Sequence, residues 1–277
     1  MNPTSPISHP KTQPSQDASA ISQLQKDLFI SRKSPYSPNL ELMFLKKVHR
    51  ILPPQTSVIF DPSAGGMIFP TLKGRDQAFA PSSCQVSKKV FPDTWTKESE
   101  CPYAVGSKEA NVFGTGLGVF KLPEEDARIP IVTANEQNVS YYGLTLLEKG
   151  SKINLHNRCP LGVLTYHFHK DYLKDYVLNE KLGGGIPIET HDFCHIYAPG
   201  KASSGHVIIG KKEPASASIA FTGFIIPEGK ALFLPAGTIH GDATFTGDLT
   251  MLVAKEDADA VVFRSSEGEM INPFFLV

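Results

Sequence analysis

Short apolar runs, separated by turns, recur through the second half of the chain. Each run is four to eight residues long and is bounded by Gly, Pro or charged residues, which is typical of β-strands rather than helices. The turn Glu148–Ser151 separates two of the runs. We therefore expect strands at 141–147, 152–156, 219–226, 249–254 and 260–263. Strands of this length and spacing predict an all-β domain over residues 131–277.

The pattern between residues 39 and 51 differs from these runs. Apolar residues recur every three or four positions at Leu40, Phe44, Val48 and Ile51, and Pro53-Pro54 follows. This spacing predicts a helix that ends before the prolines. We expect this helix to cover an open end or face of the β-sheet. It would belong to an N-terminal extension over residues 39–130 that packs on the barrel formed by the β domain of residues 131–277.

Residues 1–38 are rich in Pro, Ser, Thr and Gln. Such a composition offers little apolar surface to offset the entropy lost on ordering, so we expect a mostly disordered segment. Ile21, Leu24 and Leu28 have helical spacing, and a short amphipathic helix is expected within it.

The stretch Pro227–Asp242 combines tight turns with a histidine. Leu232-Phe233-Leu234 predicts a short buried strand, and Pro235 and Gly237 predict a sharp reversal after it, with a positive φ available to the glycine. His240 then lies at the start of the next strand. A rigid turn holds a side chain in a fixed direction, which a metal ligand requires.

This stretch resembles the second sequence motif of the cupin superfamily: Gly229, five residues, Pro235-x-Gly237, two residues and His240. The family usually has Asn at the position of Thr244. Its first motif begins with Gly, five residues and His, which Gly150 and His156 match, and continues with a second His two residues on and a Glu a few residues later. Here Arg158 stands in place of the second His, and no Glu follows nearby.

The resemblance implies a double-stranded β-helix, the cupin jelly-roll barrel, here with an N-terminal helical or irregular extension. It also implies one divalent transition metal (Fe, Mn, Ni or Zn) held in the barrel by histidines and a carboxylate. The metal is left open because neutral imidazole suits several divalent ions.

Further candidate ligands follow from strand alternation. His167 and His169 are two residues apart, so in a strand they share one face and can converge on one ion. The alternative is that Leu164, Tyr166 and Phe168 face the core and both histidines face solvent. The predicted metal ligands are His240, His167, His169 and His156. His191 and His195, four residues apart, are second-choice ligands or pocket-lining residues.

The leading functional hypothesis is a metal-dependent cupin enzyme that acts on a small, oxygen-rich organic molecule as an isomerase, lyase or dioxygenase. Tyr166 and Glu189 are the candidate acid–base or orienting groups. One alternative is a non-catalytic ligand-binding cupin with a degraded metal site, for which Arg158 is the main support. Another is a 2-oxoglutarate/Fe(II)-dependent oxygenase that uses His169, Asp171 and His240.

Charge and composition limit the classes of binding partner that we expect. The net charge is −1 and the pI is near 6.8, with no basic run, so nucleic acid is not expected as a partner. No apolar stretch approaches the length that spans a bilayer, and no secretory signal is indicated. We expect a cytoplasmic protein, with non-classical secretion left open. Its partner would be a small molecule, and the apolar end Phe274–Val277 leaves a homodimer open.

Overall fold

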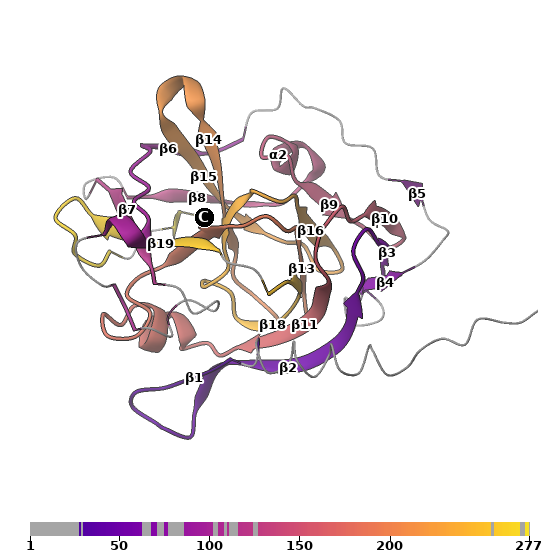
Figure 1. The fold of residues 1–277 in the computed structure, drawn as a ribbon, viewed down its shortest axis with the longest axis horizontal. Helices are drawn as coiled ribbons and strands as arrows, with labels where there is room; N and C mark the ends of the chain where they lie inside the picture. The colour runs from indigo at the N-terminus through magenta and orange to yellow at the C-terminus, as the bar shows by residue number, and fades with distance from the viewer. Residues whose placement is uncertain are drawn as a thin grey trace, which may run out of the picture.

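Two large β-sheets wrap into a nearly closed mixed barrel in the computed structural model (Figure 1). The structure describes residues 28, 30–62, 68–70, 75–76, 86–101, 105–107, 110, 116–123, 127–255, 258–271 and 275–276. Strands dominate this described part of the chain. The expectation of an all-β fold is confirmed at this level.

The first sheet has seven strands. Their order is β1 (Ser31–Lys33), β2 (Glu41–Leu52), β11 (Leu161–Phe168), β18 (Gly247–Val253), β13 (His195–Pro199), β16 (Ala231–Leu234) and β9 (Thr145–Leu147). A four-stranded sheet lies beside it, in the order β4 (Ile68–Pro70), β3 (Ser57–Phe60), β10 (Ser151–Asn154) and β5 (Arg75–Asp76).

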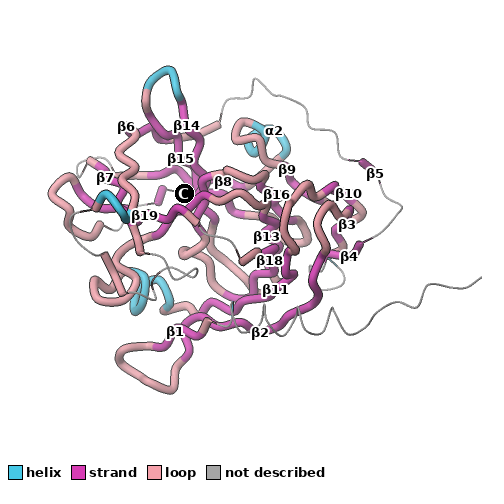
Figure 2. The backbone as a smooth tube through the Cα atoms, viewed as in Figure 1, coloured by secondary structure: helices cyan, strands magenta, loops and turns pink. Residues whose placement is uncertain are grey.

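The second large sheet has nine strands. Their order is β20 (Phe275–Leu276), β8 (Ile129–Thr133), β15 (Ser218–Ile225), β14 (Val207–Glu213), β17 (Ile239–Gly241), β12 (Pro187–Thr190), β19 (Asp259–Ser265) and β7 (Gly118–Leu122), with β6 (Lys89–Pro92) paired to β15. Figure 2 shows short helical segments at the periphery of the strands. They are α2 (Glu136–Ser140), a π-helix (Leu173–Val177) and two 3-10 turns (Glu98–Glu100 and Pro214–Ser216). In the described part of the chain, no helix has the length and apolarity needed to cross a bilayer.

Aromatic packing joins three strands of the second sheet within the main core. Phe120 of β7, Phe221 of β15 and Phe263 of β19 are fully buried, and their ring centroids lie 5.4–5.8 Å apart in edge-to-face pairs. Edge-to-face contacts add to the stabilisation from burial alone. The three rings therefore pack β7, β15 and β19 together in the core.

The helix expected over residues 39–51 is wrong. Residues Glu41–Leu52 form the long strand β2, which pairs antiparallel with β11 and also with β1. A spacing of four residues matches two strand repeats as well as one helical turn, so Leu40, Phe44 and Val48 fit either structure. Register shifts within the β2–β11 ladder then move Ile51 out of strict alternation. Pairing with the neighbouring strand β11 selects a strand over a helix, and the sequence of residues 39–51 alone does not reveal that pairing.

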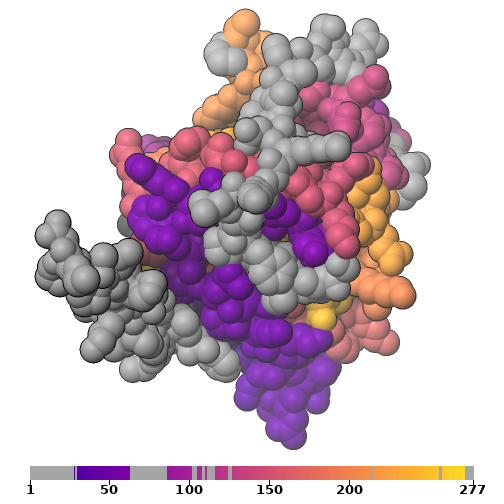
Figure 3. All heavy atoms as spheres, turned by 90° about the vertical axis from the view of Figure 1, so that its right-hand side faces the viewer, coloured from indigo at the N-terminus to yellow at the C-terminus, as the bar shows by residue number. Residues whose placement is uncertain are grey.

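Part of the segment expected to be disordered is ordered. Ser31–Lys33 form β1, Leu28 is buried and its carbonyl accepts a hydrogen bond from the Tyr166 hydroxyl at 3.0 Å. The indigo N-terminal residues form a band down one face of the molecule (Figure 3). Ile21 and Leu24, and with them most of the predicted amphipathic helix, lie outside the described residues. Disorder is therefore incorrect for residues 31–33.

Deletion of residues 1–34 should lower the free energy of unfolding by about 3 kcal/mol more than deletion of residues 1–26. The longer deletion removes the buried Leu28 side chain and the β1 ladder, and the shorter one retains both. Chemical denaturation of the two truncated proteins measures the difference. Equal stabilities would show that β1 does not contribute to the fold.

Candidate metal centre

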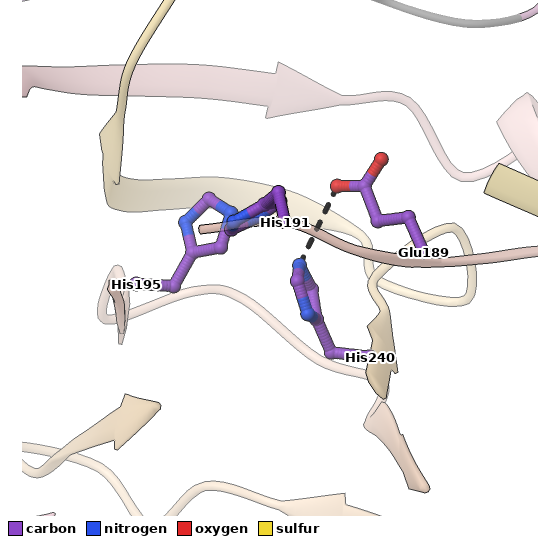
Figure 4. Close-up of side chains that lie close together, drawn as sticks. All are labelled: Glu189, His191, His195 and His240. Carbon is purple, nitrogen blue, oxygen red and sulfur yellow. Dashed lines mark ion pairs between the residues drawn. The ribbon is translucent and has the colours of Figure 1, made fainter. Parts of the chain in front are cut away.

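Three strands bring three histidines and a glutamate together inside the barrel. Glu189 lies in β12, His191 directly follows that strand, His195 begins β13 and His240 is in β17. One ligand atom from each side chain lies within 4.8 Å of those from the other three. Figure 4 shows the four side chains converging.

The register of two neighbouring strands fixes half of this cluster. β12 and β17 are antiparallel, and Glu189 lies directly opposite His240. Residues opposite each other in an antiparallel pair project to the same face, so both side chains enter the same space. Glu189 Oε1 lies 3.4 Å from His240 Nε2.

The Pro235–Gly237 turn connects the backbone before His240 to the backbone of His191. Gly237 has φ +78°, as its place in the motif predicts, and its N–H donates to the His191 carbonyl at 2.8 Å. The Thr238 hydroxyl donates to the Pro235 carbonyl at 2.7 Å and closes the turn. The turn that precedes His240 is therefore also bonded to the backbone of His191.

Backbone carbonyls set the tautomers of two histidines. His240 Nδ1 lies 2.9 Å from the Thr238 carbonyl, and His191 Nδ1 lies 3.0 Å from the Phe193 carbonyl. A carbonyl only accepts, so each Nδ1 must carry a proton and donate it. When the ring is neutral, Nε2 keeps its lone pair. A carbonyl partner on the far nitrogen is the usual arrangement of a metal-binding histidine.

Several nitrogens of the cluster lack hydrogen bonds. His191 Nε2 and both ring nitrogens of His195 are buried and make no well-aligned hydrogen bond within the described part of the chain. His240 Nε2 is also buried, and its partner is the Glu189 carboxylate at 3.4 Å. Each such group costs about 1–3 kcal/mol when it is left unsatisfied. The rings are held in place by stacking, His191 on Phe193 at 3.6 Å and His195 on Tyr197 at 5.2 Å between centroids. A bound cation would satisfy the lone pairs and retain this packing, so the residues fit a metal ion.

Burial and neighbouring charges shift the pKa values of the four side chains in different directions. Burial, with the nearby His240 charge, lowers the pKa of His191 to about 4, and burial lowers the pKa of His195 well below its usual value. Burial also opposes the charge on His240, but the Glu189 carboxylate outweighs it and raises the His240 pKa. In the same way, desolvation of Glu189 is outweighed by His240 and His191, and its pKa is lowered. Without metal, the charged pair is therefore Glu189 and His240.

A cavity of about 90 Å³ adjoins the cluster. Glu189, His195 and His240 line it, together with Asp242 from the residues that follow β17. Burial and the Glu189 charge raise the pKa of Asp242 to about 6. The other lining residues include three tyrosines, an arginine and an apolar wall: Tyr166, Tyr172, Tyr197, Arg32, Met43, Phe168, Met251 and Val253.

Two of the predicted ligands do not join the cluster. His167 is 34% exposed, and its Nδ1 lies 2.7 Å from Asp248 Oδ1. The residues on either side of it, Tyr166 and Phe168, are buried in the core, so alternation turns His167 outward. His169 follows the end of β11 and lies 3.4 Å from Asp171. The His169–Asp171 pair of the oxygenase hypothesis exists, but it is not brought together with His240 in the described structure.

His156 and Tyr166 are not members of the cluster either. His156 lines a separate cleft of about 320 Å³, beside Asp192 and Cys194. Tyr166 lines the smaller cavity, and burial raises its pKa well above the usual value, so its hydroxyl stays protonated and donates a hydrogen bond to the Leu28 carbonyl.

The sequence placed His240 first and ranked His191 and His195 second. Their signal was Glu189-x-His191-x3-His195, odd-numbered positions that share a strand face. Glu189 was assigned to acid–base chemistry, but the structure places it among the possible ligands. Asp242 and Tyr197 each lie two residues after a cluster histidine, His240 and His195, so strand alternation could have pointed to both. No local pattern pointed to Arg32, because the fold brings it to the cavity from β1, far away in sequence.

Comparison of the chain with protein-family models, with curated proteins and with solved structures gave no match.

Replacing Gly237 by Ala should destabilise the protein by about 1 kcal/mol and weaken zinc binding roughly tenfold. An alanine methyl group has open space there, so strain at positive φ is the direct cost, and any relaxation of the turn would move His191 and His240. Gly143→Ala is the matched control, because Gly143 has φ +75° and equally open surroundings. Denaturation and zinc titration measure both effects. If the two variants bind zinc equally well, the turn does not position the ligands.

Zinc binding at pH 6.0 should release about one proton per ion from the imidazoles rather than three, because His240 is the only one of the three histidines that is protonated beforehand. Its pKa is raised above 6.5, whereas those of His191 and His195 are lowered. Affinity should therefore fall as pH decreases through the His240 pKa, where a proton competes with the ion. Calorimetry in buffers of different ionisation enthalpy counts the protons. A release near three would show that all three imidazoles are charged in the metal-free protein.

Proposed function

We propose that this chain is a metal-dependent enzyme of the cupin type that acts on a small, oxygen-rich organic molecule. The observation that carries the proposal is the group of three buried imidazoles and one partly buried carboxylate, with ligand atoms within 4.8 Å of one another and with His191 and His195 ring nitrogens that have no hydrogen-bond partner among the described residues. Burial of such groups without a cation is costly to the fold. A functional reason for keeping them is therefore favoured.

The ligand set supports the cupin assignment. The family motif offers His-x-His and, a few residues later, Glu, followed by the distant His of the second motif. This chain offers Glu189-x-His191-x3-His195 and the distant His240. The chemical set and the spacing of two and then about four residues are similar, while the order of Glu and His differs. The nearly closed barrel and the Pro235–Gly237 turn agree with a jelly roll of this family.

The side chains around the cavity suggest which groups would bind the metal and which would transfer a proton. A bound divalent ion would polarise a carbonyl or hydroxyl oxygen of the substrate. Glu189 and the three histidines would hold the ion. Asp242 lines the cavity, and its pKa of about 6 suits a group that accepts and returns a proton near neutral pH. The apolar wall limits water in the cavity and strengthens these electrostatic interactions.

Substitution of Glu189 by Gln, or of His191, His195 or His240 by Ala, should weaken metal binding roughly 100-fold or more, since even outer-shell partners contribute 10- to 100-fold. His156→Ala, His167→Ala and His169→Ala should retain the ion, because these residues are not part of the cluster. Elemental analysis after metal loading and desalting gives the stoichiometry, and circular dichroism confirms that each variant is folded.

Loss of the metal in His167→Ala or His169→Ala, with retention in His191→Ala, would contradict the site. The enzymatic part of the proposal needs a second measurement. NMR screening of small hydroxy and oxo compounds should reveal turnover that depends on the metal and on Asp242. Stoichiometric metal without turnover would instead support the non-catalytic ligand-binding alternative.

A further inference from the structure

Arg32 of β1 reaches the cavity beside the metal centre, far from the cluster in sequence. It is only 4% exposed and lines the cavity together with Glu189 and His240. Its Nη1 donates to the Tyr176 hydroxyl and its Nη2 donates to the Ala110 carbonyl at 2.7 Å. The guanidinium carbon also lies 4.7 Å from the centroid of the Tyr176 ring. The side chain is therefore held rigidly at the cavity wall.

The charge on Arg32 has no carboxylate partner within ion-pair distance among the described residues. Its Nε is buried and has no hydrogen-bond partner in the same part of the chain. A buried arginine normally pairs with an anion, as Arg264 does with Glu180 at 2.6 Å. Nη1 and Nη2 each carry a second N–H beyond the one given to Tyr176 or Ala110. A guanidinium can bind a carboxylate through two parallel hydrogen bonds of this kind.

The balance of charge around the cavity also calls for an anion. A divalent ion and Arg32 together carry more positive charge than Glu189 and Asp242 can neutralise, even when both carboxyls are ionised. Charges withdrawn from water are stable only when they are paired. A ligand that carries a negative group would complete the balance.

Size and lining decide which anion fits. About 90 Å³ corresponds to roughly three water molecules, so only a small ligand can enter. The apolar wall of Met43, Phe168, Met251 and Val253 favours a ligand with a carbon frame over an inorganic ion. The planar edge of Arg32 matches a carboxylate in shape.

We infer that the cavity binds a small organic carboxylate, with its carboxylate group on Arg32 and its carbon frame on the apolar wall. The inference rests on the proposed function, in which the metal centre holds a further oxygen of the same molecule. Arg32 would then select substrates by charge, and the metal ligands would act on the neighbouring oxygen.

The test compares carboxylates with their neutral amides on the metal-loaded protein. Acetate and lactate are titrated against acetamide and lactamide, with inorganic phosphate as a further probe, and metal content is measured in parallel. Wild-type protein should bind each carboxylate at least tenfold more tightly than its amide and more tightly than phosphate. Arg32→Gln should retain the metal and lose roughly 10- to 100-fold of the carboxylate affinity. Arg264→Gln, which removes a buried arginine outside the cavity, should keep it.

The outcomes separate the two claims. If wild-type protein shows no preference for carboxylates over amides, or binds phosphate best, the inference is overturned without any variant. If Arg32→Gln binds carboxylates as wild type does, Arg32 is not the anchor. If the wild-type protein retains no metal, the proposed metal centre fails, whereas a carboxylate preference that depends on Arg32 would still identify the anion site.

Discussion

The contact between Glu189 and His240 across β12 and β17 is the interaction on which the centre depends. It places a carboxylate and an imidazole together in the barrel interior, where either charge alone would be costly. Their pairing keeps Glu189 ionised and raises the His240 pKa, whereas His191 and His195, which have no such close partner, are held neutral by burial. The same four groups that satisfy one another poorly in the metal-free protein would satisfy a cation well. Such poorly satisfied buried groups lower the stability of a fold and are typical of functional sites.

The barrel secures this contact through register. A slip of one residue between β12 and β17 would turn Glu189 or His240 to the opposite face of the sheet. β17 is short, yet it pairs with β12 on one side and with β14 on the other, which fixes its position. The turn before it is hydrogen-bonded to His191 through Gly237, so the two halves of the centre share one backbone connection. The site therefore depends on several strands that are distant in sequence, and on none of them alone.

The sequence predicted those features that local chemistry determines. The strand class, the reversal at Pro235–Gly237 and the place of His240 followed from turn residues and short apolar runs. The helix expected near Val48 failed because a four-residue spacing fits a strand equally well, and pairing with β11 decides the structure. His167 and His169 were preferred over His191 and His195 because alternation gives two faces without showing which is internal. Arg32 could not be predicted at all, since only the folded sheet carries β1 to the cavity.

X-ray absorption spectroscopy of the zinc-loaded protein tests the central claim most directly, because it reports the ligands of the bound ion itself. The structure predicts a first shell of nitrogen and oxygen at about 2.0–2.1 Å, with the multiple-scattering signature of three imidazoles. Replacement of His191 by Gln should reduce that signature to two imidazoles, while replacement of His167 by Gln should leave it at three. A sulfur ligand at about 2.3 Å, or a signature of fewer than three imidazoles in the wild-type protein, would contradict a centre built from Glu189, His191, His195 and His240.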